Sequence, residues 1–316
     1  MATYYGTYGQ KVQYLASDPS DPQTGQVWYN STSATLKVRS VTTSGTWASG
    51  GTLNTLRNAG GGAGIQTAAL LASGAPPAPG FTSASETYNG TSWTSTSPVN
   101  FARRNSGSAN AAPQTAALIF GGAGSPPSVT AETEAWNGTS WTVTPGSLNT
   151  PTSANAGAGT QTAALSFGGG LGTQTESYNG TSWTSVNSLN TGRDGGSGCG
   201  TQTAALAIGS PPSAVESWNG TSWTATTSTP VAKDQRGAAG TQTANVIFGG
   251  YPNTSDTFLW NGSTWTANPT GLATARGGSA GAGTQTLAIA MGGSPGGGTE
   301  EWTGPGVGTT KTVTVS

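Results

Sequence analysis

The stretch "TYNGTSWT" at residues 87–94 returns four times, with small changes, along this chain of 316 residues. The copies are "AWNGTSWT" at 135–142, "SYNGTSWT" at 177–184, "SWNGTSWT" at 217–224 and "LWNGSTWT" at 259–266. The tryptophan after Asn-Gly therefore falls at 93, 141, 183, 223 and 265, with an earlier counterpart at Trp47. A glutamine before an apolar run recurs in step with it, at 66, 114, 161, 202, 242 and 285. Both series advance by 40 to 48 residues, so the chain is built from one repeated unit.

Each unit predicts four short β-strands. A Gly/Ala tract such as "GGSGCG" is the innermost strand, because crowding at a central channel leaves little space for side chains. "TAALIF" is the second strand, and "TESY" and "TSWT" are the third and fourth. No segment shows a 3.6-residue apolar rhythm, and the period is that of propeller blades rather than helical solenoids. We therefore expect an all-β, six-bladed β-propeller with a short N-terminal β-hairpin extension.

The Asn-Gly step and the tryptophan have separate structural tasks in this interpretation. Asn-Gly predicts a tight type I′ hairpin turn between the third and fourth strands, since both central residues of that turn need positive φ. Each tryptophan offers a large ring that a chain buries only by folding, and we expect it to pack between adjacent blades.

Ring closure leaves two alternatives in the sequence. The N-terminal strand around "SGTWAS" can complete the last blade, since Trp47 precedes Leu53 as Trp183 precedes Leu189. The C-terminal "KTVTV" at 311–315 is the competing outer strand, and we favour the N-terminal one. The expected parts are an N-terminal attachment and hairpin segment at 1–45, the propeller at 46–304 and a C-terminal strand or tail at 305–316.

The composition excludes several classes of function. Only 7% of the residues are charged and the formal net charge is −1, which gives no footprint for nucleic acid. The N-terminus shows no secretory signal, and no stretch has the length of apolar sequence that a membrane span needs, so we expect no membrane insertion. The lone Cys199 lies among glycines and is expected to be a small apolar filler.

The repeat resembles the kelch pattern over about four-fifths of the chain. The shared features are the glycine pair after the second strand, the Tyr or Trp on the third, the Trp on the fourth and the basic residue before the first. The histidine that often follows that basic residue is missing, and the "GTQTAAL" step departs from the pattern. The wording of that step, with "TEEW" at 299–302 and the ending "KTVTVS", is similar to repeat proteins predicted in marine bacteriophages. The N-terminal "GQVWYNSTSATLKV" at 25–38 resembles a short hairpin of phage tail and fibre proteins.

Sequence variation points to one face of the disc as a binding surface. The turns "GTQT" and "NGTS" are nearly identical, whereas the loops between second and third strands diverge, as in "ASGAPPAPGFTSAS" at 72–85. Variable loops on a rigid scaffold are the usual arrangement of a binding surface. Neutral drift of loop sequences is the alternative.

The same face is expected to carry the basic residues that open each unit. The candidate ligand-binding residues are Arg57, Arg104, Arg193, Lys233, Arg276 and the exposed aromatic Tyr251, with Arg103 as the alternative to Arg104 and Thr152 in the third slot. A ring of such cations could attract a carboxylate, sulfate or phosphate of a surface polysaccharide. The structural alternative, which we favour, pairs each one with a loop carbonyl or with Asp194 and Asp234.

The remaining candidates favour a structural or binding role over an enzyme. The glutamates at 86, 134, 176, 216 and 300 recur in every blade except the fifth, where Phe258 stands, and are read as a blade feature. The "NGT" sequons need no explanation beyond the turn. With no histidine there is no imidazole base or histidine metal ligand, so we expect no catalytic residues, no metal and no cofactor.

These observations, with the resemblances, predict a phage virion structural protein. The propeller would act as a tail-fibre or receptor-binding module that contacts the host surface, with glycan as the ligand. The N-terminal segment would bind other virion proteins or form a homotrimer, and the protein would be made in the host cytoplasm without a signal peptide. The alternative is a purely architectural decoration or spacer that binds only virion proteins.

Overall fold

The computed structural model describes residues 12–41, 44–77, 80–124, 129–210, 213–306 and 308–313. The chain divides into two compact units, one formed by Thr46–Trp302 and the other by Met1–Gly45 together with Thr303–Ser316. The regular structure assigned to the described residues is all β-strand. None of those residues belongs to a helix that is long and apolar enough to cross a membrane. The expectation of an all-β, propeller-like architecture is confirmed.

The Thr46–Trp302 unit contains six four-stranded sheets among its described residues. The strands of each sheet are given from the inside outward. Sheet 1 is β5 (Gly61–Ile65), β6 (Ala68–Ala72), β7 (Ser85–Tyr88) and β8 (Trp93–Ser95). Sheet 2 is β10 (Gly107–Ser108), β11 (Leu118–Phe120), β13 (Thr133–Trp136) and β14 (Trp141–Val143), and sheet 3 is β15 (Ala156–Thr160), β16 (Ala163–Phe167), β17 (Thr175–Tyr178) and β18 (Trp183–Val186). Sheet 4 is β19 (Ser197–Gly200), β20 (Ala205–Ile208), β21 (Val215–Trp218) and β22 (Trp223–Thr226); sheet 5 is β23 (Gly237–Gly240), β24 (Asn245–Phe248), β25 (Thr257–Trp260) and β26 (Trp265–Ala267); sheet 6 is β27 (Ala280–Gly283), β28 (Leu287–Met291), β29 (Thr299–Thr303) and β4 (Thr46–Ser49).

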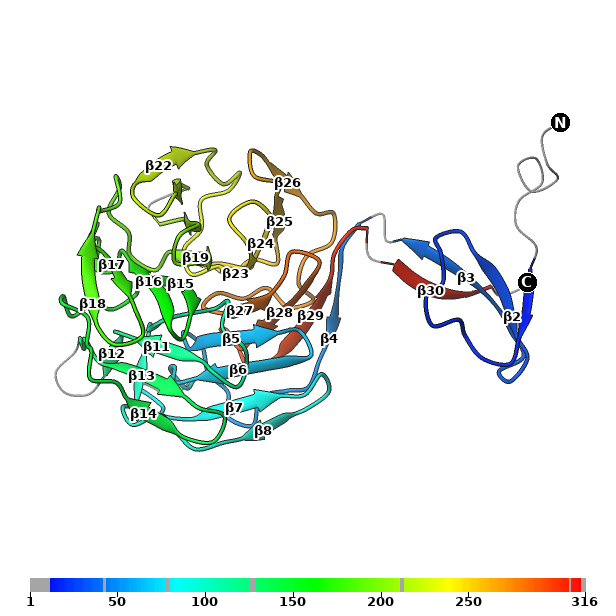
Figure 1. The fold of residues 1–316 in the computed structure, drawn as a ribbon, viewed down its shortest axis with the longest axis horizontal. Coiled ribbons are helices and arrows are strands. Elements are labelled where there is room, and N and C mark those ends of the chain that lie inside the picture. The colour runs from blue at the N-terminus through cyan, green and yellow to red at the C-terminus, as the bar shows by residue number, and fades with distance from the viewer. Residues whose placement is uncertain are drawn as a thin grey trace. The chain divides into compact units, whose positions relative to one another are not determined.

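The six sheets stand around a common axis, as Figure 1 shows. Each innermost strand contacts the innermost strands of the two neighbouring sheets, in the cycle β5, β10, β15, β19, β23, β27 and back to β5. Glycine makes this approach feasible. A Cβ added at Gly157 would clash with the backbone of Ser108, one at Gly198 with the backbone of Gly157, and one at Gly281 with that of Ala238. The Gly/Ala tracts are therefore innermost strands because only small residues fit there.

The N-terminal strand closes the ring. β4 is the outermost strand of sheet 6 and lies beside β29, so residues from the two ends of the unit complete one sheet. The Trp47 indole N–H donates to Thr257 Oγ1 at 2.9 Å, on sheet 5. The favoured closure is confirmed. The alternative through "KTVTV" is wrong because Lys311–Val313, the described part of that segment, pairs with residues 36–38 of the smaller unit.

The smaller unit joins both ends of the chain in one sheet. Its strand order is β1 (Gln13–Leu15), β2 (Val27–Asn30), β3 (Thr35–Val41) and β30 (Gly308–Val313). The β2–β3 hairpin falls on the expected N-terminal hairpin, and β30 pairs antiparallel with β3 from Leu36–Val313 to Val41–Gly308. A strand thus lies within the range 305–316 that was expected to hold a C-terminal strand or tail. This strand completes the sheet that the N-terminal segment begins.

The Asn-Gly turns differ from the predicted type. Tyr88 pairs with Trp93, which leaves a four-residue loop in place of a two-residue turn. Gly90 has φ of +88°, whereas Asn89 is not among the residues with positive φ, so the turn is not type I′. Asn89 Oδ1 instead accepts the backbone N–H groups of Thr91 and Ser92, both at 2.9 Å. The asparagine caps the turn through its side chain, an arrangement that favours this residue type.

The outer tryptophans bond each sheet to the sheet before it. The indole N–H of Trp183 donates to Thr133 Oγ1 at 2.9 Å, and its ring packs edge-on against Phe120 of the same preceding sheet, with centroids 4.8 Å apart. The same bond joins Trp93 to Thr299, Trp141 to Ser85 and Trp223 to Thr175. The prediction that these rings pack between neighbouring repeats is confirmed, and a hydroxyl acceptor on the preceding sheet adds direction to it.

The recurring glutamine is a second inter-sheet clamp. The Gln114 side-chain amide donates to the carbonyls of Ala69 and Tyr88, both at 2.7 Å, on the second and third strands of sheet 1. Gln66, Gln161, Gln202, Gln242 and Gln285 do the same to sheets 6, 2, 3, 4 and 5. One amide thus satisfies two backbone acceptors that face the gap between sheets. This explains the strict recurrence of Gln at this position.

Gln161→Glu should destabilise the protein by about 2–4 kcal/mol, because it removes two donors and sets a carboxylate against the carbonyls of Ala117 and Trp136. Thermal or denaturant unfolding of the full chain measures this. Thr181→Glu adds the same charge on an exposed turn and should change stability little. Equal stability of the two variants would contradict the clamp.

Asp18 in the smaller unit gives a pH prediction. Its carboxylate accepts Trp28 Nε1 at 3.0 Å and Asn30 Nδ2 at 2.7 Å and pairs with Lys37 Nζ at 2.7 Å. The Lys37 contact foremost, then Asn30 and Trp28, lowers the Asp18 pKa from 3.8 to about 2. Because the pKa of Asp18 is lower in the folded protein, the ionised carboxylate stabilises the smaller unit above the ordinary pKa of 3.8. This stabilisation is lost as the pH falls through about 2. The Trp28 indole N–H resonance should therefore titrate near pH 2; a midpoint near 4 would contradict the arrangement.

Candidate functional site

The connections between consecutive sheets and the loops between second and third strands lie on one side of the Thr46–Trp302 unit. Asn58 of a connection pairs with Ala75 of such a loop, and Asp234 pairs with Tyr251 in the same way. We call this side the loop face. It carries the divergent sequence segments, so the candidate site is sought here.

A closed ring of backbone hydrogen bonds surrounds the axis at the loop face. Its six members all have positive φ, near +50° to +73°, and each N–H donates to the carbonyl of the member before it: Ala59, Asn105, Ala154, Gly195, Gln235 and Gly278. The donor–acceptor distances are 2.8 to 3.0 Å, and Ala59 closes the cycle by donating to Gly278. We call it the mouth ring. The left-handed conformation turns each peptide toward its neighbour, so this face is tied together where its loops begin.

Behind the mouth ring lies a narrow axial cavity. Two adjoining hollows of about 100 and 110 Å³ are lined by residues from all six sheets, mainly Gly, Ala, Ser and Asn. At their far end the loop of sheet 2 after β10 crosses the axis. Asn110 Nδ2 donates to Gly198 O of sheet 4 at 2.6 Å, and Ala111 N–H donates to Gly159 O of sheet 3 at 3.1 Å. This loop, which is two residues longer than in the other repeats, therefore closes the far end of the cavity. The axial space suits a few waters rather than a sugar ring.

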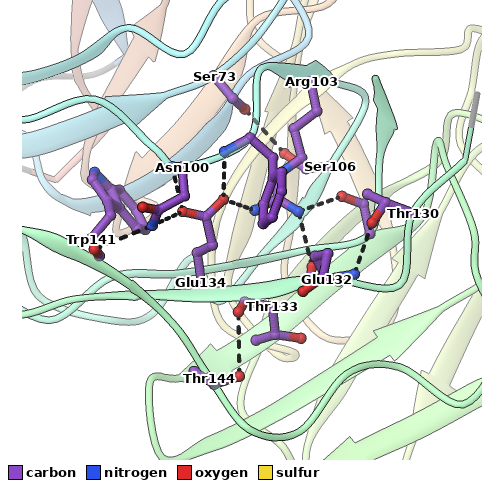
Figure 2. A network of polar contacts seen from close by, with 12 residues as sticks. Ser73, Asn100, Arg103, Ser106, Thr130, Glu132, Thr133, Glu134, Trp141 and Thr144 are labelled. Carbon is purple, nitrogen blue, oxygen red and sulfur yellow. Dashed lines mark hydrogen bonds and ion pairs between the residues drawn. The ribbon is translucent and has the colours of Figure 1, made fainter. Parts of the chain in front are cut away.

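The repeated arginine and glutamate form a buried ion pair inside each sheet that has both. Figure 2 shows the pair of sheet 2, where Arg103 Nη2 lies 2.5 Å from Glu134 Oε1 and both side chains are fully buried. Glu134 also accepts the N–H groups of Asn100 and Phe101, and Arg103 donates to the carbonyls of Gly121 and Glu132. The pair thus fastens the connection before β10 to the sheet that follows it. Arg57–Glu86, Arg193–Glu216 and Arg276–Glu300 are equivalent.

This placement decides the role of most of the predicted basic residues. Arg57, Arg193 and Arg276 are buried in these pairs and are not a cationic rim around the axis. Burial lowers the pKa of each guanidinium, and the paired glutamate opposes that shift. The favoured structural alternative holds in part. The arginines bond loop carbonyls, but their acid partners are the recurring glutamates rather than Asp194 and Asp234, because the glutamates point inward from the third strand.

In sheet 2 the buried slot belongs to Arg103, and Arg104 is exposed. The Arg104 guanidinium carbon lies 5.5 Å from the centre of the Phe81 ring. Counting back from Gln114 could not separate the two, because Arg103 lies 11 residues before Gln114, two more than the nine residues of the equivalent repeats. The glutamate 31 positions downstream is the better signal, since it identifies the cation that it neutralises.

Sheet 3 lacks the arginine and compensates locally. Thr152 occupies the slot, and Gln174 Nε2 donates to Gly168 O at 2.9 Å and to Thr152 Oγ1 at 3.3 Å. Glu176 still accepts the N–H groups of Asn149 and Thr150. An amide from a neighbouring loop therefore replaces the guanidinium donors.

Sheet 5 departs furthest from the repeat. Lys233 is half-buried at the surface, and the guanidinium slot is filled by Arg236, three residues later, which sequence spacing missed. Burial lowers the pKa of Arg236 to about 10, and Asp256 opposes the shift. Tyr251 is 60% exposed on the same loops. Of the six candidate residues, the structure brings only Lys233 and Tyr251 together at the surface.

Six large apolar side chains are exposed on the loop face. They are Leu56, Phe101, Val129, Leu171, Val231 and Tyr251, with exposed fractions from 38% to 65%. They come from connections and loops of sheets 1, 2, 3 and 5. Cys199, by contrast, is fully buried, and burial raises its thiol pKa to about 12, which fits the expected filler.

The comparisons with known proteins bear on the fold alone. No protein-family model and no curated protein matches the chain. A solved structure described as "Structure of YjhT" matches with a TM-score of 0.64 at 14% sequence identity, over 82% of this chain and 99% of that one. At this identity the likeness supports the propeller-like architecture and carries no activity with it.

Glu134→Gln should lower stability by about 3–5 kcal/mol, because it leaves the buried Arg103 without its counter-charge. Glu132→Gln is the matched control, since Glu132 bonds Arg103 through its backbone carbonyl, and it should cost less than about 1 kcal/mol. The midpoints of unfolding measure both. Similar losses in the two variants would remove the structural role assigned to the pair.

Proposed function

We propose that this chain is a non-enzymatic binding protein of a phage virion, and that its Thr46–Trp302 unit is a six-bladed kelch-like β-propeller that contacts a saccharide of the host surface. The blade number is supported by the six sheets of the described residues and by their cyclic contacts. The kelch and phage assignments rest on the sequence resemblances given above. Virion location follows from the same resemblance.

The observation that carries the binding role is the exposed apolar set on the loop face. Six large apolar side chains stand out on the side with divergent loops, whereas the loop-face arginines other than Arg104 are buried. Exposed side chains on variable loops of a rigid scaffold are available for contact with a ligand. Apolar and aromatic surfaces among Ser, Thr and Asn side chains suit a saccharide, which presents C–H faces and hydroxyl groups. The mouth ring and the inter-sheet clamps supply the rigid scaffold that such a surface needs.

The recurring carboxylates and guanidinium groups do not make a catalytic set in this proposal. Each described Arg–Glu pair is buried and bonded to backbone groups of its own repeat, with no open face toward a substrate. A general acid or base must reach the proton that it transfers. These pairs are accounted for by the fastening of connections.

The full chain should bind at least one saccharide class on a glycan array, and Phe101→Ser combined with Leu171→Ser should weaken that binding about tenfold or more, because apolar contact area is removed. Ile65→Ser with Leu287→Ser, on the opposite face, is the control and should leave binding unchanged. Failure to bind any saccharide, or equal loss in both pairs, would overturn the proposal.

An architectural virion protein is the second candidate, and the smaller unit favours it. Its described sheet has β1 and β30 as edge strands, and an unpaired edge can accept a strand of another chain, in a virion partner or a homotrimer. Labelled antibody on intact particles separates the two roles. Label at a fibre tip supports host contact, and label inside the tail or at a capsid joint supports the architectural role.

A further inference from the structure

Sheet 5 replaces three shared features of the repeat at one place on the loop face. Sheets 1, 2, 4 and 6 hold an arginine of the connection beside a glutamate of the third strand. In sheet 5 the connection residue at that position is Lys233, the third-strand residue is Phe258, and Pro230 stands where sheet 4 has Asn190. Proline has no backbone N–H, so Pro230 cannot donate to a carboxylate as Asn190 does in sheet 4. Sheet 5 therefore lacks both the glutamate and one of the backbone donors that would bind it.

Arg236 keeps the interior of sheet 5 intact. Its Nη1 donates to Gly249 O at 2.8 Å, the carbonyl equivalent to the Gly209 O that Arg193 binds in sheet 4. Its Nη2 donates to Val231 O at 3.2 Å, and the guanidinium carbon lies 5.4 Å from the centre of the Phe258 ring. A cation–π contact thus takes the place of the ion pair. The guanidinium slot is filled, and Lys233 is not needed there.

Lys233 therefore lies at the surface beside an exposed aromatic ring. Its Nζ donates to Pro252 O at 3.1 Å, next to Tyr251, and no carboxylate among the described residues forms an ion pair with it. Asp234 and Tyr251 exchange backbone hydrogen bonds of 3.3 and 2.8 Å, which fixes the two loops against each other. An ammonium donor, a phenol ring and a carboxylate acceptor are held within one pair of adjoining segments.

We propose that Lys233, Asp234 and Tyr251 form a subsite for a sugar unit that carries a carboxylate. The inference rests on the proposed saccharide-binding role of the loop face and names the class of sugar. The phenol ring of Tyr251, 60% exposed, packs against the apolar face of the sugar. The Lys233 ammonium pairs with the sugar carboxylate, and Asp234 accepts a hydroxyl.

The departures of sheet 5 from the repeat support a functional role for the surface around Lys233 and Tyr251. A repeat position that only fastens a connection needs a buried cation, which Arg236 supplies. A second cation at the surface adds nothing to that task, and local departures from a shared pattern are expected at functional sites.

The test measures binding of the full chain to an oligogalacturonate and to a neutral galactose oligomer of the same length by calorimetry. We expect the acidic oligomer to bind more tightly. Lys233→Gln should weaken the acidic oligomer about tenfold while leaving the neutral one unchanged, as expected for one charge-assisted hydrogen bond. Lys233→Arg should retain most of the preference, and Tyr251→Ala should weaken both oligomers. Lys311→Gln, which removes an exposed cation of the smaller unit, is the matched control and should change neither.

The outcomes separate this inference from the proposed function. The subsite is overturned, and the binding role stands, if saccharides bind with no acidic preference. The same holds if Lys233→Gln leaves the acidic preference intact or Lys311→Gln removes it equally. Absence of binding to these oligomers and to every saccharide of the array overturns the binding role, and the subsite with it.

Discussion

Each sheet of the Thr46–Trp302 unit carries donors whose acceptors lie on the sheet before it, and this cyclic dependence holds the structure together. The glutamine amide after the first strand and most of the outer indole N–H groups satisfy acceptors across the gap. The mouth ring does the same with peptide groups. Because the last sheet supplies acceptors to the first, the bonds between sheets form a closed cycle, and β4 completes sheet 6. An isolated repeat would leave these hydrogen-bonding groups unpaired, so the repeats are stable only as a closed ring.

Equivalent positions of the six sheets carry different residues in some cases, and comparing them shows how the structure accommodates each change. Where sheet 4 has Val215 in place of the usual hydroxyl, Trp265 donates to Thr227 O instead and is less buried. Where sheet 3 lacks the arginine, Gln174 supplies the donors, and where sheet 5 lacks the glutamate, Phe258 lies beside Arg236. In each case the backbone group keeps a partner while the side chain changes. The constraint therefore acts on satisfied hydrogen bonds rather than on residue identity.

Much of the architecture could be predicted because it is periodic and local. Strand positions, the inter-sheet role of tryptophan and closure near Trp47 follow from repeat spacing and the apolar pattern. The β3–β30 pairing could not, since it joins the two ends of the chain and has no counterpart in the repeat. The turn type was wrong because the Asn89 side chain, rather than its backbone, stabilises the loop. The cationic rim was wrong for most of its members because spacing locates a residue along the strand but not the depth of its side chain.

The site was the least predictable part for the same reason. Arg103 and Arg236 could be identified only from their partners, which lie on another strand of the same sheet. The surface that remains after the buried pairs are removed consists of loop residues that no period describes, such as Leu171 and Tyr251. Function in this protein is expected where the repeat fails, as in sheet 5.

Amide hydrogen exchange of the six mouth-ring residues tests the cyclic account most directly. Connection residues in ordinary loops exchange quickly, whereas groups whose hydrogen bonds depend on the intact ring open only with it. The account predicts slow exchange, at similar rates, for the amides of Ala59, Asn105, Ala154, Gly195, Gln235 and Gly278, on the scale of the innermost strands. Rapid exchange at these six amides, with the strands still protected, would contradict it.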